Sequence, residues 1–537
     1  MAHDPVATNS YTTGDDAHEY LSKAHLERLG RQRPAIFSSW LTEACFVFTV
    51  VMSMMMSEYY ISGFNIILPP VSKSLHLNDS AQTWPAAAAS LTIAALLVPF
   101  ARLCDIYSSR IIFLGGPYLA TCVGSAAFLP AGLALLGCTY RPGPRKNLIF
   151  SIYGAFTCIG FYFGIFMGAV TAEFLNWRWY FWLGGIIVGF VALGGIFVIP
   201  RNLNDTDPKA RMDWLGAVTI VSGLVLIVYA FTDGGHAPNG WATPYIYITL
   251  ILGVVILLGA VYVQGWVSSQ PLLPAELFRP KYMKRLIGSL FCAYGVYGLY
   301  LFYASFYIEN VLHASPILTA AWFTPLAIGG VCLAIGGGFI LHIIPNHILM
   351  IISGLGFILS VLLFALIPEQ SVSKDPSTSF LYWAYIFPAM LCGTIGVDII
   401  FNVTNIYITT AMPRRLQAAA SGLINSLLYL GIAFWLGIGG LAISTTENLR
   451  EESLPKHKQY RIGFWTGLGV AGLSLALTLT IRMGQASSGM TADEKAEIEH
   501  REMRQTGVVG ANNVGGAEIR TSRDGEVEMA PQETSSA

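Results

Sequence analysis

Two acidic residues stand in stretches of sequence that are otherwise almost wholly apolar. Glu58 lies within SEYYISGFN, and Asp398 lies within GTIGVDIIFNVTNIYIT. If these stretches cross a membrane, an ionised side chain near the centre costs roughly 2.5–3.5 kcal/mol on insertion scales, so each acid needs a reason. Carboxyl groups that are withdrawn from water hold a proton more readily, which suits them to exchange protons near neutral pH. Both residues are therefore candidates for proton binding.

Each acid belongs to a stripe of polar residues spaced by three or four, which places the stripe on one helical face. Such a face is unfavourable against lipid, so it must look into the protein or into a water-filled cavity. Two interpretations remain open: a path for substrate and protons, or a seam of interhelical hydrogen bonds. The stripes consist of Thr394, Asp398, Asn402 and Asn405, and of Glu58, Ser62 and Asn65, while Asn425 on the next apolar run fits either network.

Tyrosines recur every three residues in the apolar run 286–309. Their rings offer flat apolar faces with a polar tip, which suits a pocket for aromatic or cationic ligands. Ordinary packing in a helical bundle is the alternative interpretation. The candidates for pocket lining are Tyr294, Tyr297, Tyr300 and Tyr303.

Gly160, Gly164 and Gly168 recur every four residues, a spacing that lets two helix backbones approach closely. A second motif, FARLCDIYSSRIIF, places three charged residues at a helix junction. Charges at such a junction can lock one conformation and release another, or they can simply orient the helices in the membrane. The residues of this candidate gate are Arg102, Asp105 and Arg110.

The chain that must position these residues is strongly apolar. Of its 537 residues, 54% are hydrophobic and 12% are charged, against about 25% charged in soluble domains. A helix needs about 20 apolar residues to cross a bilayer. By this rule, thirteen runs predict an all-α polytopic membrane protein, near 43–69, 84–104, 111–137, 148–171, 177–199, 213–232, 244–267, 286–309, 317–344, 347–367, 380–409, 417–443 and 461–482.

Several function classes receive no support from the sequence. The net charge of −1 offers no basic field for nucleic acid. The chain contains no GxxxxGK[ST], HExxH or GxSxG motif, and its eight cysteines form no CxxC pair. We therefore expect no cofactor, no metal and no enzyme activity. The polar ends, 1–42 and 484–537, are predicted to be disordered cytoplasmic tails.

The distribution of Lys and Arg conflicts with a simple alternation of spans. Basic residues concentrate in cytoplasmic loops, and both the 102–110 loop and the 141–146 loop are basic. Only the run 111–137 separates them, and one crossing cannot join two loops on the same side. At 27 residues, this run is too short for two full spans. Either it is a re-entrant hairpin, or a helix that the fold requires is missing.

Several motifs together resemble a known family over about residues 43–483. They are GFNIILPPVSKSL, TWPAAAASLTIAALLVPFARLCDIY, AAFLPAGLALLGCTYRPGPRKN, NWRWYFWLGGI, MDWLGAVTIVSGL and GVDIIFNVTNIYITTAMPRRLQAAASGLINS. The chain resembles the fungal fourteen-helix drug:proton antiporters of the major facilitator superfamily. It is especially similar to the branch of yeast aminotriazole-resistance and low-affinity ammonium transport proteins.

The resemblance implies two helical bundles, at 43–200 and 271–483, joined by two linker helices within 201–270. It also implies alternating access around a central cavity lined by the first helix and by the helix that bears Asp398. Three departures stand out. Ala101 and Ser108 replace glycines of the family's loop motif, and the Gly-Pro pair that is usual in the family's signature on the helix of Gly160, Gly164 and Gly168 is missing. The sequence GGPYLATCVGSAAFLPAGL also joins the start of one family helix to the end of the next, which indicates an internal deletion or a wrongly predicted splice junction.

By this resemblance, the leading hypothesis is a proton-coupled exporter of small organic compounds, drugs or secondary metabolites. Asp398 and Glu58 would bind protons. One alternative is a facilitator of a small inorganic solute such as ammonium or borate. Another is a membrane protein that does not transport, because of the deletion. The expected partners are a small-molecule substrate, protons and lipid, but no nucleic acid. We expect a monomer in the plasma membrane, with the vacuolar membrane as the alternative.

Overall fold

The computed structural model describes residues 32–483, except for 77–82, 117–118, 120, 141–143, 202, 204–209, 236, 238–239, 341–343, 369–377, 413 and 451–453. The predicted disordered tails fall outside the described residues, apart from 32–42. No strand occurs in the described part of the chain, and thirteen of its helices are long and apolar enough to cross a membrane. The prediction of an all-α polytopic membrane protein with about thirteen spans is confirmed.

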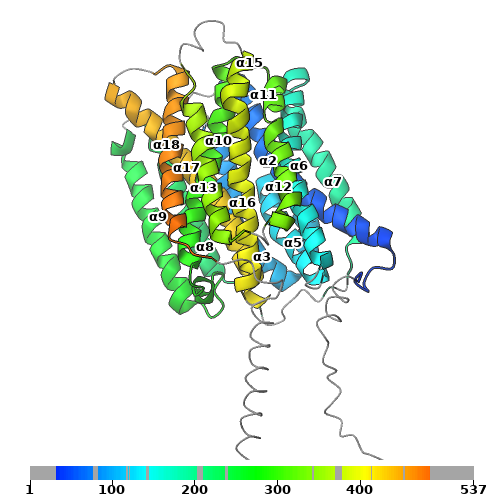
Figure 1. Cartoon of the computed structure of the whole chain (residues 1–537). Helices are drawn as coiled ribbons and strands as arrows, with labels where there is room; N and C mark the ends of the chain where they lie inside the picture. The colour runs from blue at the N-terminus through cyan, green and yellow to red at the C-terminus, as the bar shows by residue number, and fades with distance from the viewer. Residues whose placement is uncertain are drawn as a thin grey trace, which may run out of the picture.

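Along the chain, a pair of helices separates an earlier set from a later set, and Figure 1 shows that this pair, α8 and α9, lies at one side of the array. We call α2–α7 the amino half and α10–α18 the carboxy half. The amino half contains α2 (Trp40–Ser74), α3 (Thr83–Tyr107), α4 (Ser109–Gly115), α5 (Thr121–Thr139), α6 (Pro144–Phe174) and α7 (Trp177–Val198). The linker pair is α8 (Trp214–Asp233) and α9 (Pro244–Tyr262). The carboxy half contains α10 (Met283–Asn310), α11 (Pro316–Trp322), α12 (Thr324–Ile340), α13 (Asn346–Ala365), α15 (Thr378–Leu381), α16 (Phe387–Ala411), α17 (Arg414–Arg450) and α18 (Lys456–Leu479).

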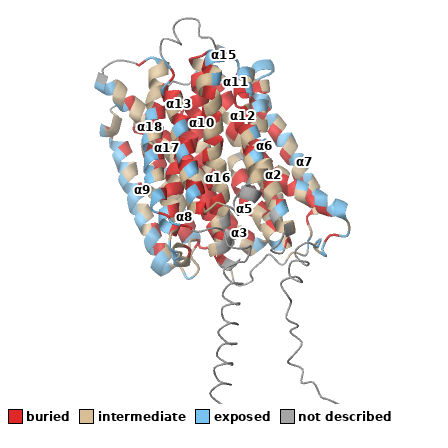
Figure 2. Ribbon diagram, viewed as in Figure 1, coloured by how far each residue is buried: buried red, intermediate tan, exposed pale blue. Residues whose placement is uncertain are grey.

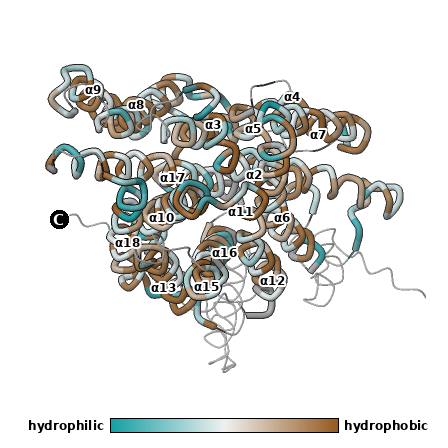
Figure 3. Tube along the Cα trace, turned by 90° about the horizontal axis from the view of Figure 1, so that it is seen from above, coloured by the Kyte–Doolittle hydropathy of each residue, from teal (hydrophilic) through white to brown (hydrophobic). Residues whose placement is uncertain are grey.

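The outermost helices present apolar side chains to their surroundings. Figure 2 shows exposed residues along α9 and α7, among them Phe190, Phe197 and Leu258. Large exposed apolar surfaces of this kind are expected where a helix meets lipid. Seen from above, α2 and α17 occupy the middle of the array, and α8 and α9 lie at its edge beside α3 (Figure 3). Val228 of α8 packs against Leu91 of α3 and Ala433 of α17, so the linker pair touches both halves.

The amino half is held together by a close approach of α2 and α6. Added Cβ atoms at Gly160, Gly164 and Gly168 would lie 2.7, 2.5 and 2.8 Å from the carbonyl oxygens of Met55, Tyr59 and Gly63, respectively. No side chain fits at these distances, so glycine is what lets α6 lie directly on the backbone of α2.

Tyr59 joins α2 to α7 by a reciprocal contact with Tyr180. The two rings stack with centroids 4.5 Å apart. The Tyr59 hydroxyl donates a 2.8 Å hydrogen bond to the carbonyl of Tyr180, and the Tyr180 hydroxyl donates to the carbonyl of Tyr59. Both tyrosines are fully buried. Their polar tips are satisfied by backbone acceptors, as a buried hydroxyl requires.

The segment that conflicts with the charge pattern is a hairpin of one short helix and one longer helix. The short helix α4 runs antiparallel to α5, because Phe113 meets Phe128 with ring centroids 6.0 Å apart and the carbonyl of Gly116 lies beside Gly124. The seven residues of α4 rise only about 10 Å, which is far short of a bilayer. The run thus folds back on itself, and only one of its two helices, α5, is long enough to cross a membrane.

Both ends of the hairpin lie at the same end of the bundle. The Arg110 guanidinium donates hydrogen bonds of 3.1 and 3.2 Å to the carbonyls of Ile199 and Ile196, where α7 ends. Beyond α5, the Tyr140 hydroxyl donates a 3.1 Å bond to Glu43, where α2 begins. The end of α7 lies beside the beginning of α2, since the two helices run antiparallel with Gly194 next to Thr49 and Gly184 next to Tyr60.

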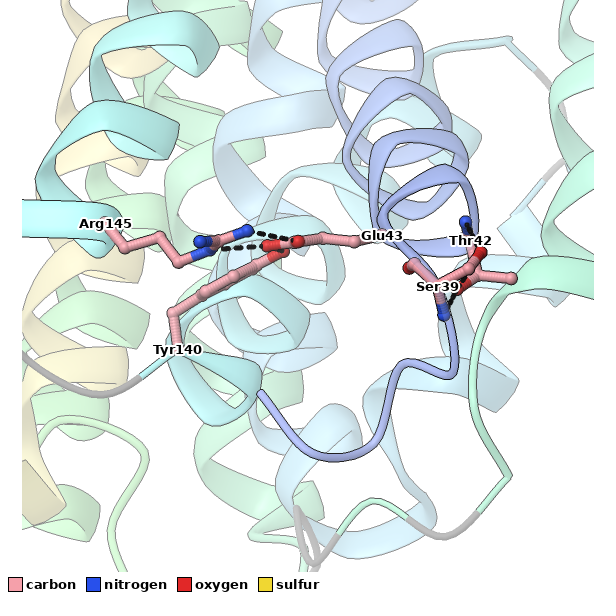
Figure 4. A network of polar contacts seen from close by, with 5 residues as sticks. All are labelled: Ser39, Thr42, Glu43, Tyr140 and Arg145. Atoms are coloured by element: carbon pink, nitrogen blue, oxygen red, sulfur yellow. Dashed lines mark hydrogen bonds and ion pairs between the residues drawn. The ribbon is translucent and has the colours of Figure 1, made fainter. Parts of the chain in front are cut away.

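Glu43 also pairs with Arg145 at the beginning of α6, so one buried carboxylate joins three segments (Figure 4). Burial and the neighbouring carboxylate raise the pKa of the Tyr140 hydroxyl, which therefore stays a donor. The hydrogen bonds to Glu43 raise the pKa of the Arg145 guanidinium. Figure 4 also shows the capping box of α2, in which Ser39 and Thr42 exchange hydrogen bonds.

Candidate functional site

A cavity opens along the seam, by which we mean the contact between the amino and carboxy halves. Its walls come from α2, α3 and α6 of one half and from α10, α12, α16 and α17 of the other. The space between its walls is about 1200 Å³, together with the open solvent at its mouth. No Lys, Arg or His is among the described residues that line it. Its polar lining consists of Glu58, Asn65, Ser90, Thr157, Cys158, Tyr297, Asp398, Asn402, Asn425 and Tyr429.

Glu58 faces this cavity from α2. Its side chain is half-buried, and its Oε1 accepts a 3.3 Å hydrogen bond from the hydroxyl of Tyr429 on α17. Tyr429 is 2% exposed, so the donor is fixed by the packing around it. The carboxylate of the amino half is thus contacted by a side chain of the carboxy half.

Asp398 faces the same cavity from α16. Its Oδ1 lies 3.6 Å from the thiol sulfur of Cys158 on α6, within the range for a sulfur donor. A Cβ on Gly330 of α12 would lie 3.0 Å from Oδ2, so a glycine leaves the space that the carboxylate occupies. The hydroxyl of Tyr297 lies close enough to both carboxylates to interact with them electrostatically.

Six of the predicted site residues meet at the cavity, namely Glu58, Asn65, Tyr297, Asp398, Asn402 and Asn425. Three members of the polar stripes do not line it. Ser62 donates a 2.6 Å bond to the carbonyl of Phe161, between α2 and α6. Thr394 donates a 3.0 Å bond to Leu326 of α12, and Asn405 donates a 3.0 Å bond to Phe401 of its own helix. Ser62 and Thr394 thus form the interhelical hydrogen bonds that one interpretation predicted, and a path for substrate and protons stays a prediction for the members that line the cavity.

Three of the four tyrosines that were predicted to line a pocket do not line this cavity. Tyr294, Tyr300 and Tyr303 lie in the core of the carboxy half, each at most 1% exposed. The Tyr300 hydroxyl lies 2.9 Å from the sulfur of Met390, and Tyr303 packs its ring against Phe464. The reason is geometric, because α10 is surrounded by α13, α17 and α18 and turns only a narrow face to the cavity.

The residues of the candidate gate contact two different parts of the structure. Arg102 lies 3.8 Å from Asp105 and donates a 2.8 Å bond to Gln270, which follows the linker helices. Arg110 instead holds the end of α7. These three charges therefore do not form one lock, and their role in gating stays a prediction.

Comparisons with known proteins identify the family of this chain. Residues 118–436, more than half of the chain, match the family model of the Major Facilitator Superfamily. The chain belongs to the Major Facilitator Superfamily. The protein is thus a membrane transporter with a small-molecule substrate, and not an enzyme. The resemblance inferred from the sequence motifs is confirmed.

Two relatives illustrate the range of the family. The transporter is 29% identical to the efflux pump terJ of Aspergillus terreus, with 90% of this chain and 95% of the relative covered. It is 28% identical to the low affinity ammonium transporter of Saccharomyces cerevisiae, with 82% and 89% covered. A crystal structure of a peptide transporter, POT, in complex with sulfate shares the fold, with a TM-score of 0.55 at 16% identity, and covers 85% of this chain and 96% of that chain.

Two residues that contact the carboxylates of the transporter's cavity were missed in the sequence. Tyr429 follows Asn425 by four residues and so lies on the same helical face, a spacing that could have indicated it. Cys158 stands two residues before the glycine series of α6 and carries no signal of its own, because a lone cysteine in an apolar run is usually packing.

Proposed function

We propose that this transporter is a proton-coupled exporter of small organic compounds. One observation supports the proposal above others: two carboxylates, one from each half, face a single cavity whose described lining has no basic side chain. A carboxylate without a cationic partner must find its positive charge elsewhere, either in a proton or in a cationic substrate. A site of this composition can exchange one for the other as access alternates between the two sides.

The remaining walls favour an organic substrate. Phe161, Tyr297, Phe401 and Tyr429 contribute aromatic rings, and most of the other lining residues are aliphatic. Aromatic faces attract cations and also bury apolar surface, so they suit an amine or another cation with an apolar body. The relative named an efflux pump is consistent with export as the direction.

The test is a proton-flux assay in proteoliposomes that contain a trapped pH indicator. Flux is driven by whichever compound of a panel of organic amines and cationic dyes the wild type transports. We expect Asp398→Asn to lower the substrate-driven flux about tenfold or more, and Glu58→Gln to lower it as well. The matched control is Asp233→Asn, which changes a carboxylate among Tyr229, Tyr245 and Trp84, at the linker helices. Unchanged flux in Asp398→Asn would defeat the proton role.

A second function is favoured by a different observation, the similarity to a low affinity ammonium transporter. A cavity with two carboxylates and no lining cation also suits ammonium. Uptake of labelled methylammonium, compared with accumulation of the organic panel in the same vesicles, separates the two. Transport of any solute by this chain would end the idea that the internal deletion leaves it inactive. We expect a monomer in the plasma membrane, with the vacuolar membrane as the alternative.

A further inference from the structure

The hydrogen bonds of the two cavity carboxylates both cross the seam, and the donor lies in the carboxy half for one and in the amino half for the other. Glu58 belongs to the amino half and accepts from Tyr429 of the carboxy half. Asp398 belongs to the carboxy half and lies against the thiol of Cys158 of the amino half. Each half therefore supplies one carboxylate and one donor.

Two other hydrogen bonds across the seam use acceptors that a proton in the cavity does not change, and a third, from the N–H of Ile317 to the carboxylate of Glu173, lies outside the cavity. Ser426 of α17 donates a 2.5 Å bond to the carbonyl of Ala94 on α3. The hydroxyls of Tyr162 on α6 and Thr324 on α12 lie 2.8 Å apart. A backbone carbonyl or a hydroxyl accepts a hydrogen bond regardless of the proton on a carboxylate. The bonds at Glu58 and Asp398 differ because their acceptor atom is the group that takes the proton.

We propose that Tyr429 and Cys158 are positioning residues that couple the proton on each carboxylate to the contact between the two halves. This inference rests on the proposed proton coupling. An ionised carboxylate binds a hydroxyl by a charge-assisted hydrogen bond, and the bond weakens when a proton occupies the carboxyl oxygen. Protonation therefore loosens the seam. By thermodynamic reciprocity, separation of the seam removes the donor and favours the proton on the carboxyl group.

The two contacts are unequal. A phenolic hydroxyl is a strong donor, whereas a thiol is a weak one. The bond from Tyr429 is also shorter, at 3.3 Å, than the sulfur contact of Cys158 at 3.6 Å. Tyr429 is therefore the principal coupling residue, and Cys158 is the minor one.

A neighbouring tyrosine serves as a control that is close to Glu58 but does not bond across the seam. Tyr153 on α6 is buried and lies close enough to Glu58 to interact with it electrostatically, but it belongs to the same half as Glu58. If Tyr429 served only to tune the charge around Glu58, Tyr153 would contribute in the same way. If the bond across the seam is what matters, removal of the Tyr153 hydroxyl has no effect on seam closure.

The geometry also provides a reporter of seam closure that needs no substrate. A Cβ on Gly422 of α17 would lie 3.5 Å from the Cβ of Ala101 on α3, which is within the range for a disulfide. The variant Ala101→Cys/Gly422→Cys should therefore cross-link rapidly with copper phenanthroline when the seam is closed. The rate is read by mass spectrometry of the proteolysed full-length transporter, which separates this disulfide from those of the native cysteines.

At one fixed pH, we expect Tyr429→Phe to slow this cross-linking about tenfold. Glu58→Gln, which resembles the protonated form, slows it similarly, and the two changes together slow it no further. Cys158→Ala has a smaller effect of about two- to threefold, while the controls Tyr153→Phe and Cys332→Ala match the parent. All variants are first checked for monodisperse elution, and Glu58→Gln keeps the test decisive if Tyr429→Phe does not fold.

Three results would overturn the inference: parental rates in both Tyr429→Phe and Glu58→Gln, equal slowing by Tyr153→Phe, or additive slowing in the double variant. If the rates are parental but both carboxylates are needed for proton flux, the inference fails and the proposed function stands. If cross-linking slows but proton flux ignores both carboxylates, the proton coupling itself is wrong, and the inference fails with it.

Discussion

Helix α2 takes part in two contacts of different kinds. One is the backbone interface with α6, and the other is the seam between the two halves. One side of α2 lies against the glycines of α6, where the polar groups are backbone carbonyls and hydroxyls with fixed partners. The other side carries Glu58 into the cavity, where its hydrogen bond comes from the opposite half. Backbone contact inside a half favours one rigid arrangement, whereas a side-chain bond to a titratable group can be made and broken. The rigid interface is thus the support against which the seam can move.

The largest expected effect comes from adding one methyl group to the rigid interface. In Gly164→Ala, the new Cβ would lie 2.5 Å from the Tyr59 carbonyl oxygen, so α2 and α6 must separate. Overpacking of this kind costs about 1–3 kcal/mol, and we expect the upper part of that range because the neighbour is backbone. The measurement is the apparent Tm of the purified protein in detergent.

The matched control is Gly189→Ala on α7, where an added Cβ meets no atom within 4 Å. It should leave Tm unchanged or raise it slightly, because alanine favours a helix. Equal Tm values for the two variants would mean that the close approach of α2 and α6 does not limit stability.

A smaller loss of stability is expected where charge, and not backbone contact, joins the amino half. Glu43 is 5% exposed and is held by Arg145 and Tyr140, so Arg145→Gln removes the cation that faces this buried carboxylate. Because the Arg145 side chain is 32% exposed, the loss should be about 1–2 kcal/mol, between the values for exposed and buried pairs.

The readout is again the apparent Tm, and the comparison is Arg145→Lys. Lysine keeps the charge but cannot form the paired guanidinium contact, so it should recover only part of the loss. If Arg145→Gln were as stable as the wild type, Glu43 would be solvated from outside the bundle, and charge would contribute nothing to this end of the amino half.

Much of the fold was predictable because the bilayer imposes a length and a polarity on each helix. The apolar runs predicted the thirteen spans, and the basic loops on either side of the run 111–137 marked it as an exception among them. Charge patterns state only on which side a loop lies, so they left two explanations for this run. That the run folds back on itself is shown by a contact between its two helices, such as that of Phe113 with Phe128, which sequence spacing does not encode.

The residues of the candidate site could be predicted where burying their side chains in a membrane costs free energy. Glu58 and Asp398 are expensive in a membrane, and both line the cavity. Tyrosine has no such cost, since its ring packs in a core as readily as in a pocket, and Tyr294, Tyr300 and Tyr303 lie in the core of the carboxy half. Which face of a helix meets the cavity depends on how its neighbours surround it, and that is a property of the whole bundle.

The smallest expected effect tests this distinction between core and cavity on a single helix. The Tyr303 hydroxyl is buried without a hydrogen-bond partner among the described residues. Tyr303→Phe removes this unpaired polar group, so stability should be unchanged or raised by less than about 1 kcal/mol, with transport unaltered. Two turns earlier on α10, Tyr297 lines the cavity near both carboxylates. Tyr297→Phe should also leave Tm unchanged, but it should alter the concentration dependence of transport, measured in the same vesicles. Only a hydroxyl that meets substrate or proton can affect transport without affecting stability. If transport changed in Tyr303→Phe and not in Tyr297→Phe, the cavity would therefore lie on the face of α10 that carries Tyr303, contrary to the structure.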